Sequence, residues 1–211
     1  MCSKLRTVPQ DPSGHRERNG RYIDGHKPTL IRNATVWTGE PTEGTTAEDA
    51  YAGKGYSWIQ SDVLIEYGLI KRVERDIQDL PEDCQVFNAG GRQLTAGIID
   101  MHSHTTVDPL PSLRGGEDTN ELSNDITPYV RSIDGMNPLD PQLQVIKSGG
   151  VTTSLVLPGS GNNMGGEAFV IKHAVGKPDG RSMISNEDML ADPDHTWRYM
   201  KMACGEVIPT F

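Results

Sequence analysis

The sequence predicts an α/β fold that is preceded by a small all-β unit. Strand patterns separated by turns extend to about residue 93, and a strand, a helix and a second strand then follow in that order. A strand–helix–strand order implies two parallel strands joined by a right-handed crossover. The composition agrees with this class, because 35% of the residues are hydrophobic, 6% are aromatic, and 23 Gly and 14 Pro make the chain rich in loops.

The all-β unit is predicted to occupy residues 28–93. Three segments have strand patterns, namely residues 29–38, 62–73 and 84–89. The middle segment is typical of two strands around a tight turn near Gly68. Residues 39–60 predict a long exposed loop, and the polar residues 1–27 predict a disordered or surface-bound arm.

The strongest functional signal is the segment Leu94–His104, an apolar run that ends in two histidines one residue apart. Side chains alternate between the faces of a β-strand, so Asp100, His102 and His104 are expected to point the same way. Imidazole is the commonest metal ligand in proteins. Asp100 is the natural partner for the remaining N–H of a metal-bound imidazole. The spacing therefore predicts a metal site at the end of a buried strand.

The second half of the chain, residues 94–211, carries the α/β pattern. Its predicted elements are a long loop over residues 105–136, a helix over 140–148 with Asp140 as N-cap, a strand over 151–157, a glycine-rich turn over 158–166, an apolar run over 168–171, and a helix over 186–203 interrupted near Asp192-Pro193.

The glycine-rich turn has two interpretations. It is not a phosphate-binding P-loop, because no Gly-Lys-Ser/Thr follows it. Its backbone amides, around Gly161, Asn162 and Asn163, could hold a substrate carbonyl or carboxylate at the carboxyl end of a parallel strand. Alternatively, the segment is a flexible connection between two strands. Neither interpretation depends on a fixed spacing, so the sequence leaves both open.

Other candidate ligands carry weaker signals. His173 follows an apolar run and could reach a metal, although a lone histidine there is more often buried without a ligand role. His195 fits a helix start, and Lys172 is too early in the chain to be a bridging lysine. We therefore assign His102 and His104 as ligands, and no general base is identified.

Several functional classes are disfavoured by the composition. A net charge of −9 without a basic run argues against nucleic-acid binding. No apolar run is long enough to cross a membrane, and residues 1–25 lack the apolar core of a signal peptide. A cytoplasmic protein is therefore expected. Three cysteines without CxxC spacing predict neither a disulfide framework nor a cysteine zinc site.

The residues around the histidine pair resemble the amidohydrolase superfamily, and most closely its imidazolonepropionase-like branch. The matching parts are the strand ending in Asp-x-His-x-His at residues 100–104, the opening segment Asn33-Ala34-Thr35-Val36-Trp37-Thr38-Gly39, and the glycine-rich stretch that follows Gly149-Gly150-Val151-Thr152-Thr153. The resemblance implies an N-terminal β-sandwich followed by a (β/α)8 barrel. It makes His102 and His104 ligands of a divalent metal, with zinc expected.

The resemblance also implies that the site is incomplete in this sequence. Members of the superfamily take further ligands and a catalytic aspartate from later barrel strands, and 118 residues remain from residue 94, whereas a barrel needs about 250. The sequence thus predicts two or three barrel strands of a truncated hydrolase acting on carbon–nitrogen bonds of small molecules such as cyclic amides. Within the hydrolase class, the His-x-His pattern does not exclude a deaminase or a sugar deacetylase, and oligomerisation is left open. The alternative is an inactive fragment that serves as a weak metal-binding or interaction module.

Overall fold

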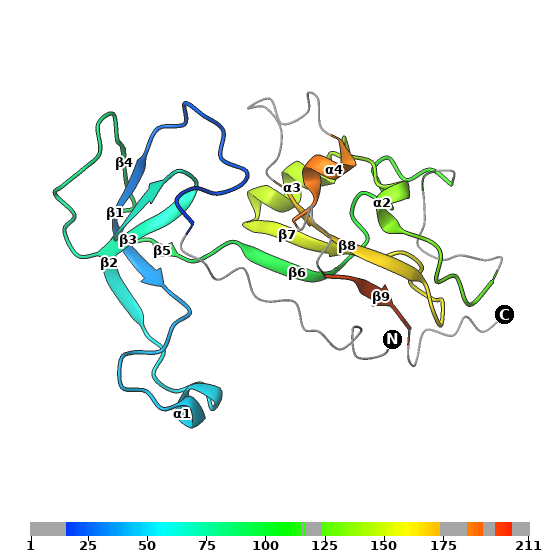
Figure 1. Cartoon of the computed structure of the whole chain (residues 1–211), viewed down its shortest axis with the longest axis horizontal. Helices are drawn as coiled ribbons and strands as arrows, with labels where there is room; N and C mark the ends of the chain where they lie inside the picture. The colour runs from blue at the N-terminus through cyan, green and yellow to red at the C-terminus, as the bar shows by residue number, and fades with distance from the viewer. Residues whose placement is uncertain (1–15, 115, 117–123, 174–184, 192–196, 204–211) are drawn as a thin grey trace. The chain divides into compact units, whose positions relative to one another are not determined.

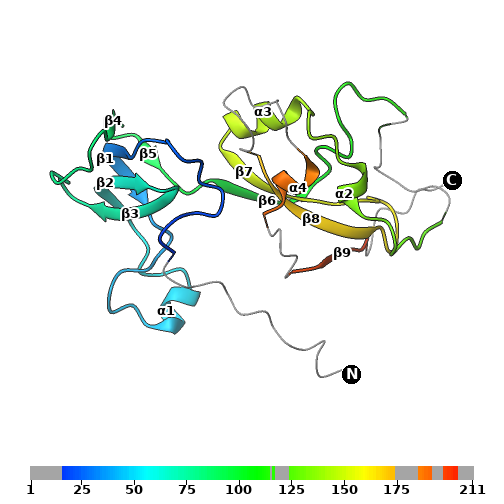
Figure 2. The ribbon, with the colours of Figure 1, turned by 45° about the horizontal axis from the view of Figure 1, so that its top comes forward.

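The structure, a computed structural model, describes residues 16–114, 116, 124–173, 185–191 and 197–203. These residues fall into two compact units, which we call the β unit (residues 16–96) and the histidine unit (residues 97–203). Figures 1 and 2 show the elements of each unit from two directions.

The β unit is built on one five-stranded sheet. Its strands are β1 (Thr29–Trp37), β2 (Trp58–Glu66), β3 (Leu69–Glu74), β4 (Gln85–Asn88) and β5 (Gln93–Leu94). The order is β3-β2-β1-β4, with β5 also paired to β1; β1 is antiparallel to β2 and parallel to β4 and β5. The described residues form a single sheet here, and the predicted second sheet of a sandwich is not among them.

Of two local predictions in the β unit, the hairpin turn is confirmed and the long loop is partly wrong. The tight turn near Gly68 is confirmed, because Tyr67 and Gly68 both have positive φ, 52° and 71°, as a two-residue hairpin turn requires. The loop prediction for residues 39–60 is wrong at two places. Helix α1 (Ala47–Tyr51) begins where the Thr46 side chain caps the Asp49 N–H. Strand β2 already begins at Trp58, which pairs with Trp37 of β1.

Apolar residues of the β unit form two buried clusters. One contains the buried residues Ala34, Val36, Val63 and Ala89, and the other contains Leu30, Leu64 and Ile77. Residues 16–27 of the arm lie along the β2–β3 turn, where the Asn19 N–H donates to the Tyr67 carbonyl at 2.9 Å and the Tyr22 and Tyr67 rings meet edge to face. Residues 1–15 of the arm lie outside the described residues.

The histidine unit contains a four-stranded mixed sheet with the order β6-β7-β8-β9. Its elements are β6 (Ile98–Ser103), α2 (Ser132–Gly135), α3 (Gln142–Ser148), β7 (Val151–Val156), β8 (Gly166–Lys172), α4 (Asn186–Met189) and β9 (Tyr199–Lys201). The parallel pairing of β6 with β7 and the helix between them confirm the predicted strand–helix–strand order. The predicted single strand over residues 94–104 is divided, because Leu94 belongs to β5 and Ile98 begins β6.

The sheet does not continue as parallel strands beyond β7. Strand β8 is antiparallel to β7, and β9 is antiparallel to β8. The nine residues between Val156 and Gly166 are too few for a parallel crossover, which needs about a dozen or more residues. The described sheet therefore has two parallel strands in the order expected for a barrel, and a third is not observed.

The predicted helix over residues 186–203 is largely wrong. Helix α4 ends at Met189, the Ala191 N–H donates to Val170 of β8, and β9 pairs with β8. The free edge of β8 thus draws this segment into the sheet, and tertiary pairing overrides the helical pattern. The interruption predicted near Asp192-Pro193 lies outside the described residues.

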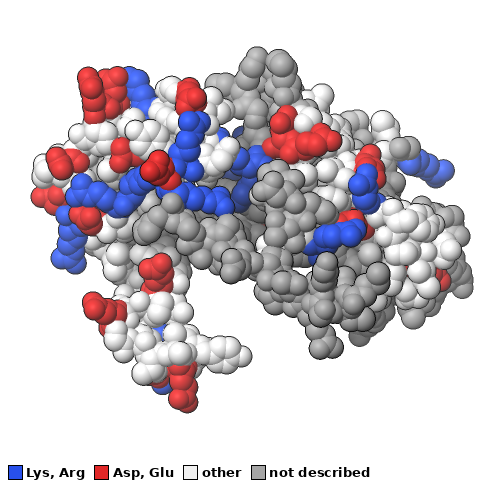
Figure 3. Space-filling view, viewed as in Figure 1, with Lys and Arg blue, Asp and Glu red and all other residues white. Residues whose placement is uncertain are grey.

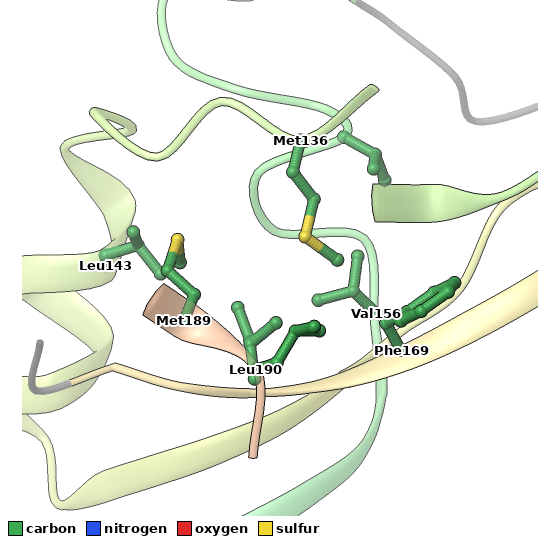
Figure 4. Close-up of a cluster of buried hydrophobic side chains, with 8 residues drawn as sticks. Met136, Leu143, Val156, Phe169, Met189 and Leu190 are labelled. Carbon is green, nitrogen blue, oxygen red and sulfur yellow. The ribbon is translucent and has the colours of Figure 1, made fainter. Parts of the chain in front are cut away.

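Helices α2, α3 and α4 supply the cover of one face of the sheet in the histidine unit. Figure 4 shows side chains from each of these regions converging on those of β7 and β8. The cluster consists of Val107, Met136, Leu143, Val156, Phe169, Ile171, Met189 and Leu190, each at most 8% exposed. This packing fixes the direction of β7, and through its pairing that of β6.

Charges of both signs are interspersed on the face of the β unit shown in Figure 3, in keeping with exposed ion pairs such as Arg18–Asp24 and Arg72–Glu74. In the part of the chain that the structure describes, no helix combines the length and apolar character that crossing a bilayer would require.

Candidate metal centre

The histidine pair lies at the carboxyl end of β6. His102 is on the strand and His104 follows it directly, while the Leu157 N–H donates to the Ser103 carbonyl at 2.9 Å and fixes this end against β7. Both parallel strands therefore end beside each other. In open and closed α/β sheets, ligands bind at this end of the strands.

The two imidazole rings are neighbours. Their centroids are 5.4 Å apart and their planes meet at 69°. His102 is exposed, whereas His104 is half-buried, and both ring nitrogens of His104 are inaccessible to solvent without a hydrogen-bond partner. Buried polar atoms normally have partners, so an unpartnered imidazole beside a second imidazole is consistent with two ligands of one metal ion.

The environment of His104 favours its neutral form. Burial lowers its pKa below the ordinary value of 6.5, and the charges of His102 and Lys201 lower it further. The backbone near Leu157 and the Asp108 carboxylate oppose this lowering. Burial is the largest of these effects, so the net shift is downward. Because a metal binds the neutral imidazole, the lowered pKa keeps His104 in its ligand form at neutral pH.

The burial predicted for the histidine strand is wrong. Ile98, Ile99 and Met101 on β6 are 55%, 62% and 75% exposed, because β6 lies at the edge of the sheet and the described helices cover the face formed by β7 and β8. The strand is also irregular, since its register with β7 shifts twice. The apolar character of β6 was a sound strand signal, but burial depends on neighbours that the described residues do not supply.

Asp100 has a local role in this structure. Its carboxylate accepts the backbone N–H of His102 at 3.1 Å, which stabilises the chain between the two residues. Among the described residues, no hydrogen bond joins this carboxylate to a nitrogen of either imidazole ring. The role of Asp100 as partner of a metal-bound histidine therefore stays a prediction.

The glycine-rich turn lies at the same end of the sheet as His104, because it follows the carboxyl end of β7. Asn162 is 2% exposed and donates from its side chain to the Asn124 carbonyl, while Asn163 is exposed. The N–H groups of Met164 and Gly165 donate to the carbonyls of Asp125 and Lys201.

Its glycines are needed for close packing. A Cβ on Gly165 would lie 2.5 Å from the Pro158 carbonyl oxygen, and one on Gly166, where φ is +124°, would lie 2.5 Å from the Val130 carbonyl oxygen. The turn is therefore a packed connection between β7 and β8, and these two amides are not available to a substrate. Substrate contact by Gly161, Asn162 and Asn163 stays a prediction, and the Asn162 side-chain amide is bonded to the Asn124 carbonyl at 2.9 Å.

The other candidate ligands do not join the pair. His173 Nδ1 lies 2.9 Å from the Val151 carbonyl, at the amino end of β7, so five strand residues, or roughly 17 Å, separate it from the His104 end. The Lys172 ammonium donates to the Thr153 hydroxyl at 2.8 Å. His195 lies outside the described residues. Across the described ranges, no three His, Cys, Asp or Glu side chains gather closely enough to hold a metal ion.

Lys201 is the residue of this site that the sequence analysis missed. It lies on β9, its carbonyl accepts the Gly165 N–H at 2.9 Å, and its charge acts on His104. An ion pair between Glu167 of β8, whose side chain is 8% exposed, and Arg198 holds β9 in place, with contacts of 2.7 and 2.9 Å. No local pattern indicated this placement, since residues 186–203 were predicted to form a helix.

Comparisons with known proteins point to one superfamily. No family model matches the chain. The amidohydrolase TasK of Hapsidospora irregularis is 64% identical over 209 residues, which are 97% of this chain and 21% of that protein. A dihydroorotase of Thermoanaerobacter sp. (strain X514) is 33% identical over 75 residues, 36% of this chain and 14% of that protein.

A solved structure points to the same superfamily. An amidohydrolase from Thermotoga maritima superposes with a TM-score of 0.61 at 31% identity, covering 84% of this chain and 39% of that one. The chain thus spans about a fifth of the length of TasK and two fifths of this structural neighbour. None of these three proteins is named as an imidazolonepropionase, so that branch stays a prediction.

Proposed function

Because the chain belongs to the amidohydrolase superfamily, we propose that it forms part of a metal-dependent hydrolase that cleaves non-peptide carbon–nitrogen bonds in small molecules, such as those of cyclic amides. The observation that carries the proposal is the pair of unpartnered ring nitrogens on His104, next to the His102 ring. The names of the relatives support hydrolysis of such bonds but not a particular substrate.

The residues present fit two ligand positions of a divalent metal, and zinc suits imidazole ligands. His102 and His104 would hold the ion at the carboxyl end of β6. A bound zinc ion supplies an activated water and polarises a carbonyl. His104 contributes a neutral, buried nitrogen, and Lys201 places a positive charge nearby that could attract an anionic substrate group. No general base is identified among the described residues.

The proposed architecture treats β6 and β7 as the first two strands of a (β/α)8 barrel, with residues 28–93 as a separate β domain and residues 1–27 as an arm. The parallel pairing of β6 with β7, joined through α3, supports this arrangement. A barrel would also give β6 a second neighbour and cover Ile98 and Ile99, which are exposed here.

A second candidate function is that of an inactive module that binds metal weakly or associates with another chain. The same exposed strand favours it, because an uncovered apolar edge is a template for pairing. A measurement of catalytic turnover separates the two candidate functions, because an inactive module would have none. With two ligands and no general base identified, we expect this 211-residue chain to hydrolyse cyclic amides negligibly on its own.

The test is zinc content, measured by elemental analysis of the purified, monodisperse chain and by chelator competition. We expect the chain to bind Zn²⁺ and the double variant His102→Ala/His104→Ala to lose it. His173→Gln is the matched control, because His173 is also buried but lies at the other end of β7. Equal zinc binding by the chain and the double variant would overturn the proposed site. Zinc-dependent hydrolysis that requires both histidines would overturn the expectation of negligible turnover.

A further inference from the structure

The turn that follows His104 has an unfavourable backbone conformation. Thr106 is fully buried and has φ of +71°, a region that β-branched residues rarely adopt. The turn is closed locally by the Asp108 N–H, which donates to the His104 carbonyl at 2.9 Å. Such a conformation persists only where surrounding groups determine it. The stabilising groups must therefore come from elsewhere in the unit.

Asp140, more than thirty residues later, supplies them. Asp140 is buried, with 2% of its surface exposed. One oxygen of its carboxylate accepts the Thr106 N–H at 2.9 Å, and the other accepts the Leu110 N–H at 3.3 Å. The carboxylate also accepts the backbone N–H of Gln142 at 3.0 Å and its side-chain amide at 3.2 Å. Among the described residues, no Lys, Arg or His pairs with it. Bonds from N–H groups to a buried carboxylate are strong and directional, so this carboxylate stabilises the backbone conformation that presents those N–H groups to it.

Two further contacts connect the turn to the start of α3. The Asn137 N–H donates to the Thr106 carbonyl at 2.8 Å, so the strained residue is held at both its N–H and its C=O. The Gln142 side chain donates to the Asp108 carbonyl at 2.8 Å as well as to Asp140. The backbone after His104 is thus held by residues 137–142 in addition to its own Asp108–His104 bond.

We infer that Asp140 is a positioning residue for His104: its carboxylate holds the turn that keeps the imidazole buried beside His102. The inference rests on the proposed function for its consequence, which is metal affinity. The positioning itself is a property of the metal-free chain. Groups that hydrogen-bond to metal ligands typically change metal affinity about 10–100-fold when they are removed. Asp140 acts on the backbone that carries His104 rather than on its ring, and we take the same range as the expectation.

The chain contains a matched control in the β unit. Asp62 is 5% exposed, its two carboxylate oxygens accept the N–H groups of Asn33 at 2.8 Å and Ile77 at 3.1 Å, and Asn33 also has a positive φ of 55°. Asp62→Asn and Asp140→Asn therefore disturb the same kind of N–H bonds, because an NH₂ group replaces one acceptor oxygen. Asp62 differs in that the Arg32 Nε lies 3.7 Å from its carboxylate. Only Asp140 is bonded to the turn after His104.

The first readout uses the metal-free full chain. NMR spectra of the imidazole C–H groups, assigned with His104→Ala, report the surroundings of the ring. We expect Asp140→Asn to shift or broaden the His104 signals, and Gln142→Ala to shift them less, while Asp62→Asn leaves them unchanged. Unchanged His104 signals in both folded variants, Asp140→Asn and Gln142→Ala, would overturn the inference even if Zn²⁺ binding is normal.

The second readout is the dissociation constant of Zn²⁺ from chelator competition. We expect Asp140→Asn to weaken binding about 10–100-fold and Asp62→Asn to leave it unchanged. Shifted His104 signals with unchanged affinity would refute the link from Asp140 to the metal while the proposed function stands. A wild-type chain that binds no Zn²⁺ would refute the proposed site, and the NMR comparison would still decide whether Asp140 positions His104.

Discussion

In the β unit, the central strand β1 has neighbours on both edges and carries Leu30 and Ala34 at 0% exposure. In the histidine unit, β6 lies at a sheet edge, and its apolar residues Ile98 and Ile99 are more than half exposed. Both strands carry consecutive apolar residues, Leu30-Ile31 in β1 and Ile98-Ile99 in β6. The difference shows that apolar character predicts a strand, whereas burial requires neighbours that only the tertiary structure supplies.

The largest effect that can test this comparison is expected from shortening apolar side chains in the two strands. We expect Leu30→Ala in β1 to lower the free energy of unfolding by about 2–5 kcal/mol, since it leaves a cavity in a filled core. Ile99→Ala in β6 should change it by less than about 0.5 kcal/mol, because the side chain is 62% exposed.

Urea unfolding followed by circular dichroism measures both effects. Ile171→Ala is the control within the histidine unit, because the fully buried Ile171 should show a cost comparable to that of Leu30. A large cost for Ile99→Ala would contradict the comparison, since it would mean that β6 is covered in solution.

The next largest effect concerns self-association through exposed strands. A flat apolar edge promotes pairing between chains, and a charged side chain prevents it. We expect Ile99→Lys on β6 to weaken concentration-dependent association several-fold. Ile70→Lys on β3, where Ile70 is 65% exposed without a run of exposed apolar neighbours, should change it little. Sedimentation velocity over a concentration series measures both, and equal effects would remove the distinction between the two edges.

Helix caps should give a smaller difference. Ser185 accepts the Asp188 N–H and forms a capping box at α4, which carries the buried Met189. Ser185→Ala should therefore lower the free energy of unfolding of the histidine unit by about 1 kcal/mol. Thr46 caps α1 in the same way, but α1 has no buried residue. Thr46→Ala should melt α1 without shifting the unfolding midpoint of the β unit; a clear shift would show that α1 contributes to the core.

The smallest effect is a pH dependence confined to the histidine unit. Burial lowers the pKa of His173 below 6.5, opposed in part by its bond to Val151 and by Asp100. Between that lowered pKa and 6.5 the unfolded chain binds a proton that the folded chain does not. Stability therefore falls as the pH drops through about 6.5 and levels off below the folded-state pKa.

His173→Gln should reduce this loss. Unfolding in urea with EDTA, from pH 8 to pH 5, measures it in the metal-free chain. His26, the described histidine of the β unit, is exposed. An identical pH profile for the variant and the wild-type chain would show that the His173 ring is not the source.

Much of the fold could be predicted from local patterns. The hairpin turn at Tyr67-Gly68, helix α3 ending at Gly149-Gly150, and strands β1, β4 and β7 were all within reach, because each depends on residues a few positions apart. The direction of β8 and the strand at Tyr199–Lys201 were not. Both depend on edge pairing with residues distant in sequence, which periodicity cannot reveal.

For the site, the sequence by itself determined the identity and spacing of His102 and His104 and their place at the end of a strand, because alternation along a strand is a local property. The tertiary structure decided which groups surround them. It placed Lys201 near His104, put His173 at the far end of β7, left β6 exposed, and brought Asp140 to the turn after His104. These contacts join residues tens of positions apart, and their geometry is set by the packing of helices on the sheet rather than by any local preference of the chain.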